Sequence, residues 1–397
     1  MRTRSVPAAH AIGGAQPSAT AIAESAYEPR RILFIFAWLV VGGEETEVRL
    51  LARHLERARY RIEVVACFRK PGMPEQSHEQ LATLGVVVDR TPYTRSFDDT
   101  VTYLAAKIAH GDYDLVVACQ AVPDAYPALA ALVSPPPLIE HGGLVDEALA
   151  GPKDRTARYV GVCDAIRAAA ASRMVDRPHH ALAIPSMVDL SEFDPLDRSA
   201  VRATWDIAPE VPVIGWVGRL DRKKRVEDFL RAAAYLRGTN PEARFVVIGG
   251  PDAFMPEYAD ELRTLAGALG LTDALVFLGD RPDVPRLMSG MDIFVWLSCG
   301  EGLPHVIAEA GAAGLPVVAV RDHGSVEQIE DGISGLFVPH EDPAAVAVAL
   351  ARLLADPALR TRLGRGLRDK VEREYSAAIV TRRWEALFDE VIEEARQ

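Results

Sequence analysis

From Arg30 onward, short apolar runs alternate with longer segments whose apolar residues recur every three to four positions. The short runs predict buried strands, and the longer pattern predicts helices, as at residues 45–57 and 164–172. This alternation is typical of parallel sheets that are covered by helices on both faces. In the first half of the chain, the predicted strands are residues 32–37, 62–67, 86–88, 115–118, 138–140, 159–162 and 182–184.

The same alternation begins again after a segment at residues 186–198 that has prolines near both ends and that we interpret as a linker. We therefore expect an α/β chain of two doubly wound, Rossmann-like domains facing across a cleft. The predicted parts are a flexible leader (1–29), a first domain (30–195), a second domain (196–375) and a last helix (376–397) that crosses back to the first domain. Strands of the second domain are predicted at 213–217, 244–248, 275–278, 293–297, 316–320 and 335–338.

Two glutamates, Glu301 and Glu309, stand eight positions apart across a predicted junction between a loop and a helix. Pro304 suits the first turn of that helix, and the apolar positions after it predict a buried side. The amides around residues 303–306 would then form an anion site, because a helix N-terminus presents unpaired N–H groups and partial positive charge. Carboxylates accept hydrogen bonds from hydroxyls, so the pattern favours a diphosphate that carries hydroxyl groups on both sides. Taken alone, the two glutamates would more simply lie on a solvated helix face.

A second segment, residues 215–236, carries the positive charge that such a ligand needs. Gly218 follows a predicted strand and allows a tight turn, and Arg219 and Lys224 lie in the next loop, where they could hold a diphosphate. A basic run by itself is more often a solvated face or a nucleic-acid patch.

These two segments resemble the retaining glycosyltransferases of family 4. In that family a glutamate, seven residues and a second glutamate bracket the donor sugar, and a Gly-Leu-Pro-Val-Val run follows, which residues 314–318 supply here. The Arg219–Lys224 spacing is similar to the family's Gly-Arg, four residues, Lys pattern, although Arg225 replaces the usual glycine. The resemblance implies the GT-B fold and donor contacts from the loop and helix start at Gly302, Leu303, Pro304, His305 and Val306.

Further positions gain a role only through this resemblance. Gly42 and Gly43 are similar to the family's Gly-Gly loop beside the donor, with Glu44 in place of a small residue. His141 lies just past the predicted fifth strand and resembles a strand-end histidine that contacts the transferred sugar. Arg281 lies in the loop at residues 279–284, where the family usually binds the nucleobase.

Two more segments of the chain match the family. Gly324 and Ser325 are expected to line the diphosphate or sugar pocket, and Glu327 to cap or pair locally. Asp189 resembles the family's Asn-Gly-Val-Asp motif between the domains, and we interpret it as structural.

The implied reaction is sugar transfer from a nucleotide diphosphate sugar, UDP- or GDP-linked, to an acceptor hydroxyl with retention at the anomeric carbon. Arg219, Lys224 and the helix amides would stabilise the leaving diphosphate, so the resemblance implies no metal and no cofactor besides the donor. Glu301 would orient the sugar, Glu309 would hold the ribose and His141 would contact the sugar. The acceptor stays unassigned.

Composition narrows the classes of partner. The 397 residues, 49% of them hydrophobic, suffice for two cores, and a formal net charge of −12 argues against nucleic-acid binding and broad contact with an anionic membrane. The charge does not argue against transient docking of the protein to a lipid acceptor. No run of 18 uncharged apolar residues predicts a spanning helix, and residues 1–29 lack the apolar core of a signal peptide, so we expect a cytoplasmic protein. The cysteines are widely spaced and predict reduced thiols: Cys67, Cys119, Cys163 and Cys299.

Three different kinds of protein could also carry these patterns. A metal-dependent GT-A enzyme would use an Asp-x-Asp motif, which residues 112–114 spell at the start of a buried strand. A GT-B epimerase or phosphorylase would share the fold. A non-catalytic nucleotide-sugar binding scaffold would bind without turnover.

Overall fold

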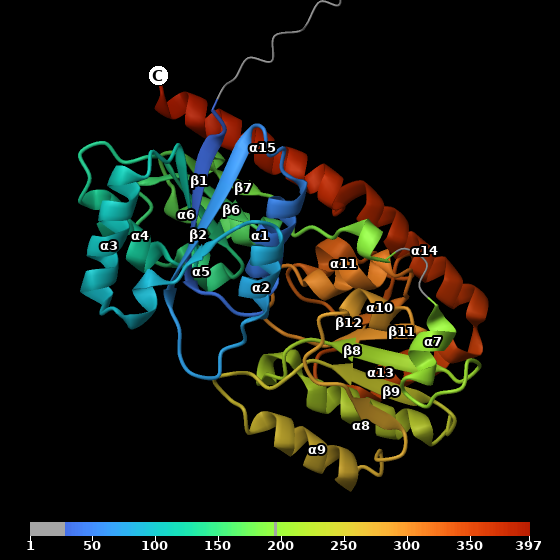
Figure 1. The fold of residues 1–397 in the computed structure, drawn as a ribbon. Coiled ribbons are helices and arrows are strands. Elements are labelled where there is room, and N and C mark those ends of the chain that lie inside the picture. Colours follow the sequence, from blue (N-terminus) through green and yellow to red (C-terminus); the bar gives the residue numbers. More distant parts are fainter. Residues whose placement is uncertain (1–27, 194–196) are drawn as a thin grey trace, which may run out of the picture.

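The computed structural model describes residues 28–193 and 197–397 and contains two parallel sheets covered by helices (Figure 1). The predicted leader therefore lies outside the described residues, apart from its last two positions. The first sheet has the strand order β3-β2-β1-β4-β5-β6-β7 and the second has the order β10-β9-β8-β11-β12-β13. The expected α/β class with two doubly wound sheets is confirmed.

The first sheet is built from β1 (Arg30–Trp38), β2 (Tyr60–Phe68), β3 (Val88–Asp89), β4 (Leu115–Cys119), β5 (Leu138–Gly142), β6 (Thr156–Gly161) and β7 (Ala181–Ala183). Its covering helices are α1 (Gly43–His54), α2 (Gln76–Thr83), α3 (Phe97–His110), α4 (Val122–Ala130), α5 (Val145–Leu149) and α6 (Asp164–Arg173). Short 3₁₀ turns are η1 (Thr91–Thr94), η2 (Pro178–His180) and η3 (Leu190–Phe193).

The second sheet is built from β8 (Val213–Val217), β9 (Arg244–Ile248), β10 (Leu275–Phe277), β11 (Ile293–Trp296), β12 (Val317–Val320) and β13 (Leu336–Val338). Around it lie α7 (Arg198–Ala203), η4 (Arg222–Lys224), α8 (Val226–Arg237), α9 (Tyr258–Ala268), α10 (Val284–Met288), α11 (His305–Ala312), α12 (Ser325–Gln328), α13 (Pro343–Ala355) and α14 (Pro357–Glu374). The last helix is α15 (Ala377–Ala395).

Alternate residues of β1 face two separate cores, as the two-residue period of a strand requires. Ile32 and Phe34 pack with the cluster that contains Trp384, whereas Leu33 and Ile35 pack with the cluster that contains Leu104. Because both faces are covered, the strand is apolar along its whole buried length.

One predicted strand has different bounds. The strand predicted at residues 86–88 is displaced: β3 covers Val88–Asp89, and residues 86 and 87 lie outside it. The reason lies in the end of α2: Gly85 has a φ of 78°, and the amide of Val86 donates to the carbonyl of Leu81 at 3.0 Å. That amide closes the helix end and is not available to a sheet.

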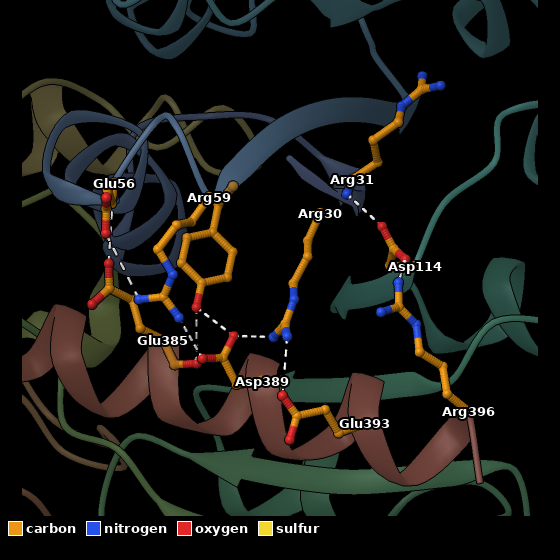
Figure 2. A network of polar contacts seen from close by, with 10 residues as sticks. Arg30, Arg31, Glu56, Arg59, Asp114, Glu385, Asp389, Glu393 and Arg396 are labelled. Carbon is orange, nitrogen blue, oxygen red and sulfur yellow. Dashed lines mark hydrogen bonds and ion pairs between the residues drawn. The ribbon is translucent and has the colours of Figure 1, made fainter. Parts of the chain in front are cut away.

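The last helix, α15, packs against the first sheet although it follows the second in sequence (Figure 1). Its apolar stripe includes Trp384 and Phe388, which belong to the same cluster as Ile32. Figure 2 shows the polar part of this contact: Arg30 pairs with Asp389, and Arg396 lies 2.6 Å from Asp114.

The chain crosses between the sheets at two places that lie side by side. The amide of Val188 donates to the carbonyl of Tyr375, and the amide of Ala377 donates to the carbonyl of Val188, both at 2.8 Å. Nearby, buried Asp189 accepts hydrogen bonds from Ser191 and from Nε2 of His54, which fits its structural interpretation. Part of the predicted linker, residues 194–196, lies outside the described residues.

In both sheets the strand order reverses direction next to the first strand, between β1 and β4 and between β8 and β11. Ligands of such sheets bind beyond the carboxyl ends of the strands at these points. The loops after β1, β8 and β11 are therefore the places where a site is expected. Within the described part of the chain, no helix is both long and apolar enough to cross a membrane.

Candidate functional site

The loops that follow β8 and β11 meet because these strands are neighbours in the second sheet. Nζ of Lys224, in η4, lies 2.5 Å from Oε1 of Glu301, in the loop after β11. The same carboxylate oxygen accepts a hydrogen bond from Oγ of Ser298 at 2.8 Å, and the amide of Glu301 donates to Asp322 at 2.9 Å. Lys224 and Glu301, which are 77 positions apart in the sequence, thus form one ion pair.

Two tryptophans that the sequence indicated only as strand residues lie below this pair. The rings of Trp216 and Trp296 stack with centroids 5.9 Å apart and an angle of 19°. Nζ of Lys224 lies 5.1 Å from the centroid of Trp296, a distance at which a cation is attracted to an aromatic face. Gly218 packs against both rings, since an added Cβ would be 3.0 Å from Trp216 and 3.2 Å from Trp296.

The other two predicted arginines do not join this ion pair. Nε of Arg219 lies 2.7 Å from Asp252, in the loop after β9. Arg281 forms a pair with Asp283 through its Nε at 2.9 Å. Both guanidinium groups are thus held by carboxylates of their own domain and remain partly exposed.

Helix α11 begins one residue later than predicted. Pro304 is its N-cap, and it cannot supply an amide donor because proline has no N–H. The amides at the start of the helix are those of His305 and Val306, and Leu303 is buried before it. The predicted anion site therefore shifts to the first two helical residues.

Glu309 lies within α11, on a side of the helix that faces the first domain. Burial raises the pKa of its carboxyl to about 7, while Arg49 of α1 acts in the opposite direction and Glu192 reinforces the shift. Among the described residues its carboxylate accepts no hydrogen bond, in contrast to Glu301, so its oxygens are free to accept one from a ligand.

The two domains touch at the predicted donor loops. A Cβ on Gly43 would lie 3.0 Å from Cδ2 of His305, and a Cβ on Gly302 would lie 2.1 Å from the carbonyl oxygen of Gly143. Gly42 is the N-cap of α1, where Glu45 turns back to accept from the amide of Val40 at 3.1 Å. At Gly302 the missing side chain lets backbone of the two domains approach closely, and at Gly43 it makes room for the His305 ring.

His141 lies inside β5, as its fourth residue, and not past the strand as predicted. The strand continues because the backbone pairing of β5 with β6 extends to Gly142. The imidazole is buried against the edge of Trp384, with ring centroids 5.3 Å apart, and its Nε2 has no hydrogen-bond partner among the described residues. Burial, with a contribution from His305, lowers its pKa to about 4, so the ring is neutral at pH 7.

Glu44, the residue that departs from the family's Gly-Gly loop, is buried in the first turn of α1. Its Oε1 has no hydrogen-bond partner among the described residues. Burial raises the pKa of this carboxyl well above its ordinary value, and Glu147 and Glu45 add to the effect. The sequence shows that Glu44 replaces the small residue of the family, but it does not show that this side chain is buried.

The segment after β12 contributes differently from what we expected. Oγ of Ser325 donates to the carbonyl of Val320 at 2.7 Å and accepts from the amide of Asp322, so its hydroxyl is occupied within its own turn. Gly324 packs on the backbone of Gly302. The local role predicted for Glu327 was wrong: its Oε1 accepts from the amide of Asp164 at 2.8 Å and thereby caps α6 of the first domain.

The Asp-x-Asp spelling at residues 112–114 precedes β4 at its amino end. Asp114 accepts from the amide of Arg31 at 2.8 Å and pairs with Arg396 of α15. It therefore lies at the opposite edge of the sheet from the loops described above.

Comparison with known proteins agrees with this geometry. A family model described as "Glycosyl transferases group 1" matches residues 197–370. The D-inositol 3-phosphate glycosyltransferase of Salinispora arenicola is 38% identical over 195 residues, which cover 46% of this chain and 43% of that protein. The protein of the same name from Mycolicibacterium gilvum is 36% identical over 173 residues, covering 43% and 38%. The chain spans about half the length of the curated relatives it matches, or somewhat less.

Solved structures resemble the chain over both sheets. Anabaena Alr3699/HepE in complex with UDP and glucose has a TM-score of 0.76 at 20% identity, covering 91% of this chain and 100% of that one. Sucrose-phosphate synthase from Thermosynechococcus elongatus has a TM-score of 0.73 at 19% identity, covering 92% and 100%. These likenesses show that the two facing sheets form the GT-B fold. The family match over residues 197–370 lies in the second domain, which is therefore the part of the chain that is similar to the glycosyl transferases group 1.

Proposed function

We propose that this protein is a retaining glycosyltransferase that moves a sugar from a nucleotide diphosphate sugar to an acceptor hydroxyl without a metal ion. The observation that carries the proposal is the Lys224–Glu301 ion pair beside the start of α11. It joins a cation suited to a phosphate with a carboxylate suited to sugar hydroxyls. The similarity to a structure with bound UDP and glucose supports a UDP-linked donor.

Breaking the bond between sugar and phosphate leaves negative charge on the diphosphate. Lys224 and the amides of His305 and Val306 would stabilise that charge, since preorganised donors act most strongly where charge develops. Arg219 could contribute by exchanging its contact with Asp252 for one with phosphate. In this arrangement protein groups alone neutralise the leaving group.

The remaining groups would orient the donor. Glu301, once Lys224 turns to phosphate, can accept from sugar hydroxyls, and Glu309 can accept from the ribose. His141 is a neutral donor or acceptor at pH 7 because its pKa is lowered, so its Nε2 could bind a sugar hydroxyl. The departing phosphate oxygen would take the acceptor proton on the same face of the sugar.

We also propose a cytoplasmic location. The four cysteines are all free in the structure, which is the ordinary state of thiols in a reducing compartment. Fusing the chain to a redox-sensitive reporter and measuring the reporter's oxidation state in cells would test it.

The proposal is tested by thermal unfolding with a panel of UDP, GDP, ADP and TDP sugars, with and without EDTA, because a ligand that binds the native state raises the Tm. We expect one nucleotide to raise the Tm whether or not EDTA is present. Loss of the shift and of turnover with EDTA would indicate a metal-dependent enzyme and would contradict this part of the proposal.

Product analysis distinguishes a transferase from an epimerase, a phosphorylase and a scaffold. Transfer with the anomeric configuration kept, followed by NMR, is the expected result. Isomerisation of the donor without acceptor would indicate an epimerase, release of sugar phosphate on adding phosphate would indicate a phosphorylase, and binding without turnover would indicate a scaffold.

A further inference from the structure

A cavity of about 310 Å³ opens in the first domain at the carboxyl ends of β1 and β2. Four aromatic side chains line it, and each keeps a large fraction of its surface exposed: Trp38 (37%), Phe68 (50%), Phe97 (55%) and Phe254 (59%). They come from four separate elements or loops, so their convergence is not visible in the sequence.

A group of exposed aromatic rings indicates what kind of ligand can bind there. Single exposed apolar side chains are ordinary, but a contiguous group of large ones marks a binding site, because burying them against a ligand gains hydrophobic free energy. Aromatic faces also prefer stacked or edge-to-face contacts with other rings. The cavity is thus suited to a flat apolar body.

Both domains build this cavity. Phe254 belongs to the loop between β9 and α9 of the second domain, and its ring lies edge-on to Trp38 of the first, with centroids 6.5 Å apart. Nζ of Lys70, also from the first domain, lies 3.7 Å from the centroid of Phe254. The second domain therefore contributes Phe254 to a cavity that is otherwise lined by the first domain.

Two short chain segments connect residues that line the cavity to residues of the candidate donor site. Asp252, which holds Arg219, is two residues before Phe254. Trp38 ends β1, and Gly42, the N-cap of α1, follows four residues later. A ligand in the cavity would lie on the same side of both sheets as the donor loops.

The polar groups of the cavity are few. Arg95 is the one cation among the described residues that line it, and its guanidinium stacks over Tyr103 at 4.7 Å. Asp124 is the one carboxyl among them, and burial raises its pKa. A phosphate is usually held by several cations or amides in direct contact, which this lining does not offer.

We propose that this cavity binds the acceptor and that the acceptor is a hydroxyl-bearing compound with a flat, apolar ring system. Trp38, Phe68, Phe97 and Phe254 enclose the ring, while Arg95 and Asp124 bind polar substituents at its edge. This inference rests on the proposed transferase function and names the substrate class of that site. It differs from the phosphorylated polyol in the relatives' names.

The test uses 2-naphthol and 4-methylumbelliferone as ring probes, with binding measured by calorimetry on the full chain. We expect saturable binding that weakens about tenfold in Phe68→Ala and in Phe254→Ala, each of which removes one stacking surface. Tyr235→Ala is the matched control, because Tyr235 is similarly exposed (61%) but lies on α8 and does not line the cavity. That variant should bind the probes as the unchanged protein does.

Donor binding is measured separately on the same proteins by the Tm shift with UDP. If UDP binds but neither ring probe does, or if both phenylalanine variants bind the probes normally, the acceptor class is wrong while the transferase proposal stands. Tighter binding of inositol phosphate or maltose that both variants weaken would likewise overturn it. If no nucleotide binds and no transfer occurs, the transferase proposal fails, and the acceptor assignment fails with it.

An assay of sugar transfer to a ring probe is the last part of the test. With the donor that gives the largest Tm shift, we expect 4-methylumbelliferone to be glycosylated. Phe254→Ala should raise the KM for 4-methylumbelliferone about tenfold, whereas the slow hydrolysis of the donor by water should not fall to a matching extent. An unchanged KM would contradict the assignment.

Discussion

Nζ of Lys224 lies 2.5 Å from Oε1 of Glu301, so the cation proposed for the leaving group is paired with the carboxylate proposed for the sugar. Both side chains are largely buried. The Lys224 ammonium and the Glu301 carboxylate neutralise each other, so neither is a buried charge without a partner. A donor that brings a diphosphate and sugar hydroxyls would separate the pair by offering each partner a replacement.

Lys224→Ala should lower kcat by roughly 10²- to 10³-fold, the usual loss when one preorganised donor to a developing negative charge is removed. Steady-state transfer kinetics measure it. Arg222→Ala is the matched control: Arg222 lies in the same basic run but pairs with Glu261 at the surface. Equal turnover in the two variants would contradict the role of Lys224.

Glu309 should make donor binding depend on pH. Its pKa of about 7 means that the carboxyl is mostly protonated at pH 6 and mostly ionised at pH 8, and only the ionised form accepts from both oxygens. Donor affinity should therefore rise about tenfold between pH 6 and pH 8. Calorimetric titration with the donor at each pH should show a flat profile in Glu309→Gln; a rise that persists there would assign the titration to another group.

The same group affects stability in the free protein. The folded-state pKa lies above the ordinary value of 4.5, so the native state keeps a proton that the unfolded chain releases. Its contribution to the free energy of unfolding is complete below pH 4.5 and is lost as pH rises toward 7. Glu309→Gln should reduce the fall in Tm across that range.

Gly302→Ala should impair the contact between the domains, because the new Cβ would lie 2.1 Å from the carbonyl oxygen of Gly143. We expect kcat/KM to fall about 10²-fold, because a displacement of roughly an ångström at a site can cost that much. Nucleotide affinity, measured by Tm shift, should change little.

Gly267→Ala serves as the control for that experiment. Gly267 lies in α9 with no atom near the position of an added Cβ, so alanine should leave activity unchanged and stabilise the helix slightly. A normal kcat/KM in Gly302→Ala would mean that the domains need not approach this closely for transfer.

Glu47→Ala should lower the free energy of unfolding by about 2 kcal/mol, because it leaves two buried donors without a partner. Its carboxylate accepts from Nε1 of Trp384 at 3.0 Å and from the amide of Met187 at 3.1 Å. Urea denaturation measures the change. Glu44→Ala is the comparison, since Glu44 is buried in the same helix turn but leaves Oε1 unpaired among the described residues; if it destabilises equally, hydrogen bonding is not the cause.

Much of the fold could be predicted from the sequence because buried parallel strands are continuous apolar runs. The strands at 213–217 and 244–248 were predicted to the residue. Errors arose where local chemistry competes with that pattern. Val86 closes a helix, and β5 continues through His141 to Gly142, beyond the predicted end at residue 140.

Less of the site could be predicted, because its contacts join distant segments. The sequence placed Glu301 before a helix and Glu309 within it, but gave no sign that Glu301 pairs with Lys224. It likewise could not show that Glu327 caps a helix of the other domain. Trp216 and Trp296 have the pattern of core residues, and their stacking depends on two strands becoming neighbours.

The two chain crossings between the sheets meet at Val188 and are joined there by backbone hydrogen bonds to Tyr375 and Ala377. Two links that are fastened together at one point act as a single hinge. A relative motion of the domains that keeps these two hydrogen bonds must pivot near this point, because sliding there would break both of them. A movement that parts the domains would separate Trp38 from Phe254 and Gly43 from His305 together, so that the proposed donor and acceptor sites would open and close together.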